Sequence, residues 1–266
     1  MITIEHVVCP SDDQMVFVIE GMRNAFNSWD KSDSAMHSCT GTGVETGFHL
    51  GEVDNALMCK LARLGSDERK FMRQMPIMMR ITAPLYWWKE FDTYKVGTVS
   101  NSCSTMHTIA DHDFRWEDFS IEYLRYEQFG TIEDDRGKMR DDAITQFENT
   151  RHTLNAYRYQ YLKAKEKGKE DLAKDYWRQM IQLLPSSYNQ TRNICMNYEV
   201  LTNIYKARRA HKLKEWRDFC GVIRKLPYFN IIEASIGPAA REKSKASNEE
   251  TQYYFKGGDL YDRSND

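Results

Sequence analysis

The sequence lacks the features that mark membrane, secreted and nucleic-acid-coating proteins. No apolar run approaches the roughly 20 residues of a bilayer-spanning helix, and the mean hydropathy is -0.69. The opening residues Met1–His6 contain neither the basic nor the apolar stretch of a secretory signal. Because 37 Lys and Arg face 39 Asp and Glu, the net charge of -2 attracts neither nucleic acid nor an anionic membrane. We therefore expect a soluble, cytoplasmic protein that binds neither a membrane nor a nucleic acid polymer.

Patterns for metal sites and disulfide frameworks are also missing. The six cysteines include no C-x-x-C pair, and the seven histidines form neither H-E-x-x-H nor an i, i+4 pair. Scattered cysteines in a chain of 266 residues are typical of reduced thiols rather than of a disulfide scaffold. We expect no metal bound by protein side chains.

What the sequence does contain is a succession of strand and helix signals. Residues 2–8 are rich in β-branched side chains, which predicts a strand, and the run Cys9–Asp13 that follows predicts a turn and a helix N-cap. Apolar residues recur at helical intervals over 53–64. The apolar run 75–82 predicts a buried strand, and Pro84 predicts the start of a helix, because proline needs no amide partner there.

The remaining segments predict loops and then helices. Stretches 27–51 and 97–108 are rich in Ser, Gly, Thr and Asn and predict long loops. After about residue 140 strand signals end, and four helix-favouring segments follow, at 141–166, 169–184, 189–208 and 211–226. We predict one α/β domain over residues 1–235 with a helical C-terminal half, and a polar, mobile tail over 236–266.

Two segments carry candidate chemistry. The first is the hydroxyl-rich loop Asn101–Thr105, whose backbone amides and hydroxyls, with Lys95 nearby, suit a phosphorylated ligand. The second is a predicted helix on which one stripe combines Asn197, Ile204, Arg208, His211 and Glu215. Arg208 could hold a phosphate and Asn197 an amide-bearing ring. The alternatives are an ordinary connecting loop and a solvated helix face.

Together these segments resemble the flavin-dependent thymidylate synthases. The family hallmark is Arg-His-Arg, seven residues and Ser, downstream of an Ala-Pro. In this chain Ala83-Pro84 is followed at that spacing by Thr93-Tyr94-Lys95 and then Cys103. The family's later pattern is matched in constant register by Leu184-Pro185, Asn197, Leu201, Asn203 and Arg208. The resemblance covers residues 65–225.

The hallmark positions nevertheless differ in this chain. Thr93 and Lys95 replace the two arginines, Tyr94 replaces the histidine, and Cys103 replaces the serine. Glu199 stands where the family has an arginine, and His211 lies one position before the family's flavin-contacting histidine. A lysine cannot reproduce the bidentate contacts of a guanidinium. A second hypothesis is therefore a nucleotide-binding or regulatory module on the same fold, without turnover.

The resemblance implies an α/β fold with a small mixed or antiparallel sheet packed by helices. It also implies FAD as cofactor, NADPH and methylenetetrahydrofolate as co-substrates, conversion of dUMP to dTMP, and a homotetramer with sites between subunits. By the same resemblance, the nucleotide pocket is lined by Glu90, Asn101, Cys103, Ser104 and Thr105, with Arg208 on the phosphate. The flavin is contacted by Thr93, Tyr94, Lys95, Asn197, Asn203 and His211. Cys103 and Arg208 are then expected in one cavity.

Two side-chain roles stay open at this point. A Cys103 thiolate beside Lys95 could attack C6 of a uracil ring, or Cys103 could replace serine by shape alone, which we consider the better interpretation. Trp87 and Trp88 are expected in the core rather than stacked on a ligand ring, because they adjoin a predicted strand.

Overall fold

The computed structural model describes residues 2–37, 47–237, 253–256 and 259–262. The α-helices are α1 (Asp12–Arg23), α2 (Glu52–Arg63), α3 (Leu85–Phe91), α4 (Thr105–Thr108), α5 (Ala143–Glu166), α6 (Glu170–Leu183), α7 (Tyr198–Arg208), α8 (Lys214–Ile223) and α9 (Phe229–Ala234). The strands are β1 (Thr3–Val8), β2 (Ala35–His37), β3 (Gly47–His49), β4 (Pro76–Pro84), β5 (Val99–Ser102), β6 (Thr131–Glu133), β7 (Met139–Asp141), β8 (Asn189–Asn197), β9 (Tyr253–Lys256) and β10 (Asp259–Asp262). Short 3-10 helices are η1 (Asn24–Phe26), η2 (Trp29–Lys31), η3 (Glu68–Gln74), η4 (Trp116–Asp118) and η5 (Gln128–Gly130).

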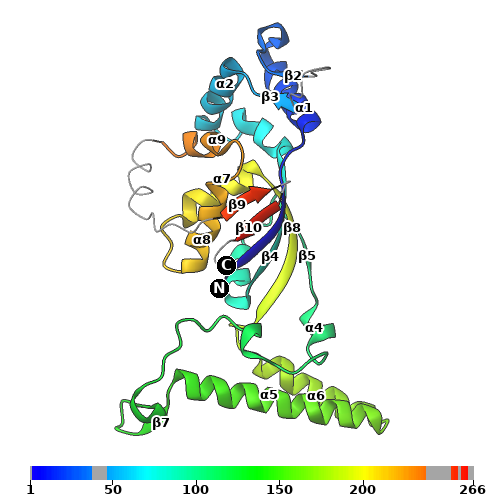
Figure 1. The fold of residues 1–266 in the computed structure, drawn as a ribbon, viewed down its shortest axis with the longest axis vertical. Helices are drawn as coiled ribbons and strands as arrows, with labels where there is room; N and C mark the ends of the chain where they lie inside the picture. Colours follow the sequence, from blue (N-terminus) through cyan, green and yellow to red (C-terminus); the bar gives the residue numbers. More distant parts are fainter. Residues whose placement is uncertain (1, 38–46, 238–252, 257–258, 263–266) are drawn as a thin grey trace. The chain divides into compact units, whose positions relative to one another are not determined.

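The chain folds into two compact units. The unit that we call the hairpin unit contains Thr82–Glu90 and Ser102–Thr191, and the mixed unit contains Ile2–Ile81, Phe91–Asn101 and the chain from residue 192 onward. Four strands are hydrogen-bonded in the order β1-β4-β8-β5 (Figure 1). The predicted α/β class, with small sheets packed by helices, is confirmed. Strands β4, β5 and β8 run through both units, in keeping with the predicted single domain.

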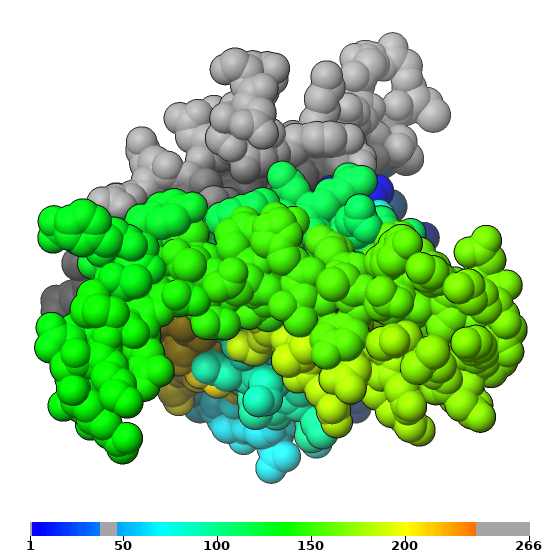
Figure 2. Space-filling view, turned by 90° about the horizontal axis from the view of Figure 1, so that it is seen from below, coloured from blue at the N-terminus to red at the C-terminus, as the bar shows by residue number. Residues whose placement is uncertain are grey.

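The hairpin unit is built around the long helices α5 and α6, which lie side by side (Figure 1) and form the face shown in green to yellow-green in Figure 2. Asp142 is the N-cap of α5, and its carboxylate accepts a hydrogen bond from the Thr145 amide at 2.8 Å. Buried apolar side chains of these helices and of the segment before them form the core of the unit: Ile109, Phe114, Phe119, Phe147, Leu154 and Met180. Trp87 and Trp88 are 0% and 1% exposed, so their predicted core position is confirmed.

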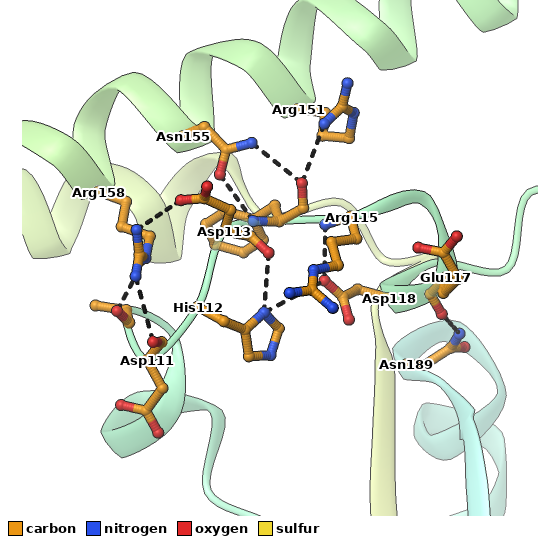
Figure 3. A network of polar contacts seen from close by, with 12 residues as sticks. Asp111, His112, Asp113, Arg115, Glu117, Asp118, Arg151, Asn155, Arg158 and Asn189 are labelled. Atoms are coloured by element: carbon orange, nitrogen blue, oxygen red, sulfur yellow. Dashed lines mark hydrogen bonds and ion pairs between the residues drawn. The ribbon is translucent and has the colours of Figure 1, made fainter.

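Side chains of α5 hold the segment that follows α4 in the same unit (Figure 3). The Asn155 side chain accepts a hydrogen bond from the Phe114 amide at 2.7 Å and donates one to its carbonyl at 3.1 Å. Arg151 also donates to the Phe114 carbonyl, at 3.1 Å. Arg158 donates to the Ala110 carbonyl at 2.9 Å. An irregular segment thus obtains partners for its backbone from helix side chains.

A buried ion pair joins α1 to α2 in the mixed unit. Arg23 donates through Nε to the Asp54 carboxylate at 2.6 Å, and the two side chains are 4% and 0% exposed. The same carboxylate accepts the hydroxyls of Ser32 and Ser34 at 2.6 and 2.7 Å. Burial raises the pKa of Asp54, but the hydrogen bonds and the charge of Arg23 outweigh it and leave the pKa below its ordinary value.

The predicted start of the chain is confirmed. Residues 3–8 form β1, and Ser11 caps α1 with the reciprocal Ser11–Gln14 hydrogen bonds of a capping box. The predicted helix over 53–64 corresponds to α2, and the predicted strand over 75–82 corresponds to β4. Local side-chain patterns therefore decide these elements.

The prediction that strands end after about residue 140 is wrong. Residues 189–197, predicted as the first part of a helix, form strand β8, and the helix begins only at Tyr198. In the strand, Ile194 and Met196 are buried while Asn193 is exposed, an alternation that suits a sheet and not a helix. The remaining predicted helices are confirmed as α5, α6, α7 and α8 with shifted ends.

The two predicted loops contain more structure than expected. Segment 27–51 includes η2 and a hairpin in which β2 pairs antiparallel with β3, and its residues 38–46 lie outside the described residues. Segment 97–108 includes β5 and α4. Short strands of polar residues escape a periodicity search, because their pairing partner and not their own pattern stabilises them.

Part of the predicted tail lies outside the described residues, namely 238–252, 257–258 and 263–266. In the described part of the tail, β9 pairs antiparallel with β10. The boundary at 235 and the mobility of the tail remain predictions. Among the described residues, no helix combines the length and apolarity that crossing a membrane requires.

Candidate functional site

The residues singled out by the sequence fall into one set in each unit. Glu90 and Cys103–Thr105 belong to the hairpin unit. The mixed unit holds Thr93, Tyr94, Lys95, Asn101, Asn197, Asn203, Arg208 and His211. The meeting of Cys103 with Arg208 in one cavity remains a prediction.

In the hairpin unit, the Cys103–Thr105 turn joins β5 to α4. Its start is tied to β8, because the Cys103 amide donates to the Thr191 carbonyl at 2.9 Å. The Gln190 side chain donates to the Cys103 carbonyl at 2.9 Å. The Ser104 carbonyl accepts the Thr108 amide and hydroxyl at 3.1 and 3.0 Å. The backbone of the turn is thus fixed while the Cys103 side chain is exposed.

In the mixed unit, Tyr94, Arg208 and His211 form one cluster. Arg208 donates through Nε to the Tyr94 hydroxyl at 3.0 Å, and its Nη1 lies 3.0 Å from His211 Nε2. His211 Nδ1 accepts the Leu213 amide at 3.2 Å. These contacts join residues 94 and 208, which are separated by more than a hundred positions.

Aromatic rings complete the cluster around Arg208. Its guanidinium carbon lies 4.8 Å from the centre of the Trp216 ring and 5.7 Å from the centre of the Tyr94 ring. Trp216 is 0% exposed, and Phe91 stacks on it at 6.4 Å. A cation that contacts two ring faces is attracted by their quadrupoles, so the guanidinium has a defined place before any ligand binds. Such an arrangement can present a fixed guanidinium to an anion.

The predicted polar stripe on one helix is wrong. Helix α7 ends at Arg208, so His211 and Glu215 lie beyond it, and Asn197 precedes it as the last residue of β8. Asn197 is the N-cap of α7, and its side chain accepts the Val200 amide at 3.1 Å. Asn203 is exposed, about 140° around α7 from Arg208. Of the predicted flavin-contacting residues, Thr93 and Lys95 are exposed and flank Tyr94.

Gly97 allows the turn after Tyr94 to approach Asn197 closely. Its φ of +78° lies in the left-handed region, and a Cβ at this position would be 3.0 Å from Asn197 Nδ2 and 3.2 Å from Val200. The contact places the turn against the first residues of α7. A glycine in a hydroxyl-rich stretch is therefore explained by the fold alone.

Replacing Asn197 by alanine is expected to lower the free energy of unfolding by about 1 kcal/mol, because the Val200 amide loses its cap. Asn197→Asp keeps an acceptor oxygen and should retain most of this stability. The exposed Asn193 of β8 provides the matched control, since Asn193→Ala removes an amide without removing a cap. Urea unfolding measures the three variants. If Asn193→Ala and Asn197→Ala lower the free energy of unfolding equally, the capping role of Asn197 is contradicted.

Glu199, at the position of a family arginine, is neutralised by arginines of η3. It pairs with Arg73 and lies 3.3 Å from Arg69, and it accepts the Ser66 hydroxyl at 3.1 Å. Burial raises the pKa of Glu199, but these hydrogen bonds and charges lower it by more. The pKa of Glu199 is therefore below its ordinary value. The charge reversal in the sequence thus has a local structural explanation.

Three residues at or near the candidate site are missing from the sequence-based prediction. Trp216 contacts Arg208, and Gln190 contacts the Cys103–Thr105 turn. Arg192 pairs with Asp92, next to Thr93, at 2.8 Å and is 14% exposed. The sequence gives no sign that Arg192 is largely covered, because residues 189–197 are predicted as helix, where an arginine is typical of the surface. In strand β8, Arg192 instead pairs with Asp92.

A cavity of about 260 Å³ lies elsewhere in the mixed unit, among α1, η2, β2 and β3. Its walls include Trp29, Met36 and Phe48, and no predicted site residue lines it. Among the described residues, no group of His, Cys, Asp or Glu gathers that could hold a metal ion.

Comparison with solved structures identifies a shared fold. A UMP/dUMP methylase, PolB from Streptomyces cacaoi, bound to 5-Br dUMP, matches with a TM-score of 0.54 at 15% identity, over 89% of this chain and 96% of that one. Thymidylate synthase X (ThyX) from Helicobacter pylori, with FAD and dUMP, matches with a TM-score of 0.51 at 15% identity, over 90% and 96%. A second structure of the flavin-dependent H. pylori enzyme gives a TM-score of 0.52 at 15% identity, over 90% and 97%.

Neither the protein-family models nor the curated proteins match the sequence. The structural likeness shows the fold of the flavin-dependent thymidylate synthases, which confirms the fold that the sequence pattern predicts. At this level of identity it shows the fold alone.

Proposed function

We propose that the protein is a divergent flavin-dependent thymidylate synthase-type enzyme. It transfers a one-carbon unit from methylenetetrahydrofolate to C5 of a pyrimidine nucleotide, in the simplest form dUMP to dTMP. The observation that carries the proposal is the Tyr94–Arg208–His211 cluster on a fold shared with enzymes solved with dUMP or its 5-bromo analogue. Residues from both segments of the resemblance meet in this cluster.

The chemistry of the donor set fits FAD. Lys95 supplies a cation for its pyrophosphate, and Tyr94 and His211, both of which contact Arg208, supply a hydroxyl and a ring nitrogen. Thr93, Asn197 and Asn203 complete the proposed flavin-contacting set. The bound flavin, reduced by NADPH, supplies the hydride that completes the transferred methyl group. The protein's own residues bind and orient the planar ligands.

The nucleotide is proposed to contact Glu90, Asn101 and the Cys103–Thr105 turn, with Arg208 on its phosphate. The turn offers a fixed backbone and an exposed Cys103 side chain. Arg208 presents donors in a planar fork that suits a phosphate monoester. We also propose a cytoplasmic homotetramer, for which light scattering should give about four times the 31.3 kDa of one chain.

An anaerobic assay tests the proposed function. The protein is incubated with FAD, NADPH, methylenetetrahydrofolate and a panel of uridine and cytidine monophosphates, and the base is analysed by mass. We expect a product with one added carbon, and purified protein with flavin absorbance near about 450 nm. Protein that binds dUMP without FAD and gives no product would favour the second hypothesis, a nucleotide-binding or regulatory module. Protein that binds neither dUMP nor FAD would contradict both the enzyme and the binding-module hypotheses.

Cys103→Ala is expected to retain most of the turnover. The proposed chemistry takes its hydride from the flavin and needs no enzyme nucleophile, so the thiol serves only as a wall of the site. Turnover of dUMP and the mass of the protein after denaturation in the presence of substrate measure the effect. A loss of turnover beyond about a thousandfold, with a covalent adduct in the wild type alone, would assign the nucleophile to Cys103.

A further inference from the structure

The side chain of Gln190 joins strand β8 to the Cys103–Thr105 turn. Its Nε2 lies 2.9 Å from the Cys103 carbonyl oxygen and 3.3 Å from the Thr105 hydroxyl. The Gln190 carbonyl in turn accepts the indole N–H of Trp88 at 2.9 Å, which ties the same residue to a buried side chain of α3. One residue thus connects the exposed turn to the core of the hairpin unit.

The chemistry of these contacts requires a donor at position 190. A carbonyl oxygen only accepts hydrogen bonds, so the nitrogen of the carboxamide must face Cys103. Glutamate has nearly the same shape, but as a carboxylate it has no proton to donate and places a negative charge against the carbonyl. Methionine has a similar length and removes the donor without adding a charge.

Other contacts hold the segment beyond the turn. Trp177 donates to the Met106 carbonyl at 3.1 Å, and Arg158 donates to Ala110. At the turn itself, the Cys103 amide is bound by the backbone of Thr191, which no substitution removes. Among the side-chain contacts described for Cys103–Thr105, that of Thr108 comes from the next turn of the same segment, whereas Gln190 binds the turn from strand β8.

We propose that Gln190 is a positioning residue for nucleotide binding, which fixes the Cys103–Thr105 turn in the conformation that receives a pyrimidine nucleotide. This inference rests on the proposed function, because that proposal places the turn against the nucleotide. A turn that is ordered before binding loses less conformational entropy when the ligand arrives. Gln190 therefore acts on affinity without touching the ligand.

The test compares Gln190→Glu with the wild type by calorimetry. We expect about tenfold weaker dUMP binding and unchanged FAD binding, because the proposed flavin residues lie in the other unit. The dUMP affinity of Gln190→Met should lie between those of the wild type and Gln190→Glu. Gln179→Glu, at an exposed position of α6, makes the same change of charge in the same unit and should have no effect. The affinity gap of Gln190→Glu should narrow as the pH is lowered, because a protonated carboxyl group can donate.

Alkylation of Cys103 provides a readout of the turn that requires no nucleotide. Iodoacetamide labelling, located by peptide mass analysis, should be faster at Cys103 in Gln190→Met than in the wild type, because methionine removes the donor without adding a negative charge that would disfavour the reacting thiolate. Unchanged dUMP affinity in Gln190→Glu would overturn the proposed role. Equal losses of dUMP and FAD binding with a lower melting temperature would overturn it in favour of a general structural one. A wild-type protein that binds no dUMP would overturn the proposed function and this role with it, even if the labelling rates differ as expected.

Discussion

Replacing Asp54 by asparagine is expected to lower the free energy of unfolding by about 3–5 kcal/mol, because it leaves the buried guanidinium of Arg23 without its counter-charge. The carboxylate is fully buried and accepts hydrogen bonds from Arg23, Ser32 and Ser34. An asparagine amide carries no charge and turns a donor group toward some of these donors. The loss therefore exceeds that of one hydrogen bond. Urea unfolding followed by circular dichroism measures it.

The same carboxylate makes stability depend on pH. The pKa of Asp54 is lower in the folded protein than in the unfolded chain, so the unfolded chain binds the proton more readily. The stabilising contribution is complete above the unfolded value of about 3.9 and is lost as the pH falls through the lowered folded value. Unfolding free energies measured from pH 7 to pH 3 should decrease less steeply in Asp54→Asn than in the wild type.

Matched variants separate the ion pair from a general effect of removing a carboxylate. Asp30→Asn changes an exposed residue of η2 and should alter stability by less than about 0.5 kcal/mol. Ser34→Ala removes the hydroxyl that donates to Asp54 and accepts the Gly51 amide, and should cost about 1–2 kcal/mol, a value still measurable if Asp54→Asn fails to fold. Equal stability of Asp54→Asn and Asp30→Asn would contradict the importance of the buried pair.

Elements β1, α1, α2 and β4 could be predicted from local patterns, whereas β2, β3, β5 and β8 could not. The cap residues at 9–13, and Pro84 before an aromatic helix, are signals contained within a few residues. Residues 189–197 are mostly polar, and only Ile194 and Met196 alternate as buried strand residues. They form a strand because neighbours β4 and β5 satisfy their backbone, and a pairing between distant segments leaves no trace in the local sequence.

The candidate site shows the same division. The resemblance selected Tyr94 and Arg208 because their spacing to other residues is constant, and the structure brings them together. Trp216 and Gln190 are invisible to that reasoning, since their roles depend on which way a side chain points after packing. Asn197 was selected for a ligand, yet its side-chain oxygen caps α7. A spacing pattern identifies positions near a site without assigning each side chain its partner.

The second large effect is expected at Arg208. Arg208→Ala should weaken dUMP binding about 100-fold, because two charge-assisted hydrogen bonds to a phosphate are lost, at about 1.5 kcal/mol or more each. Arg208→Lys should weaken it about tenfold, since an ammonium keeps the charge but neither stacks on Trp216 and Tyr94 nor donates in a planar fork. Calorimetric titration with dUMP measures both variants.

Deoxyuridine, which lacks the phosphate, distinguishes an anion-binding role from a structural one. Arg208→Ala should bind deoxyuridine as the wild type does, so that the advantage of dUMP over deoxyuridine disappears. Arg209→Ala is the matched control, because the neighbouring guanidinium donates to the Lys206 carbonyl at 3.2 Å and makes no contact with Tyr94 or Trp216 among those described. This control should retain the dUMP affinity of the wild type.

The cluster itself predicts how Tyr94 contributes. Tyr94→Phe removes the oxygen that accepts from Arg208 Nε but keeps the ring beneath the guanidinium, so dUMP affinity should fall only about threefold. Arg208 would then be less well oriented but would stay against the rings of Tyr94 and Trp216. The dUMP affinity should therefore decrease in the order wild type, Tyr94→Phe, Arg208→Lys, Arg208→Ala. Equal weakening of dUMP and deoxyuridine in Arg208→Ala, with a lower melting temperature, would show that the guanidinium stabilises the Trp216 cluster instead of binding an anion. The phosphate site would then have to be sought elsewhere on this fold.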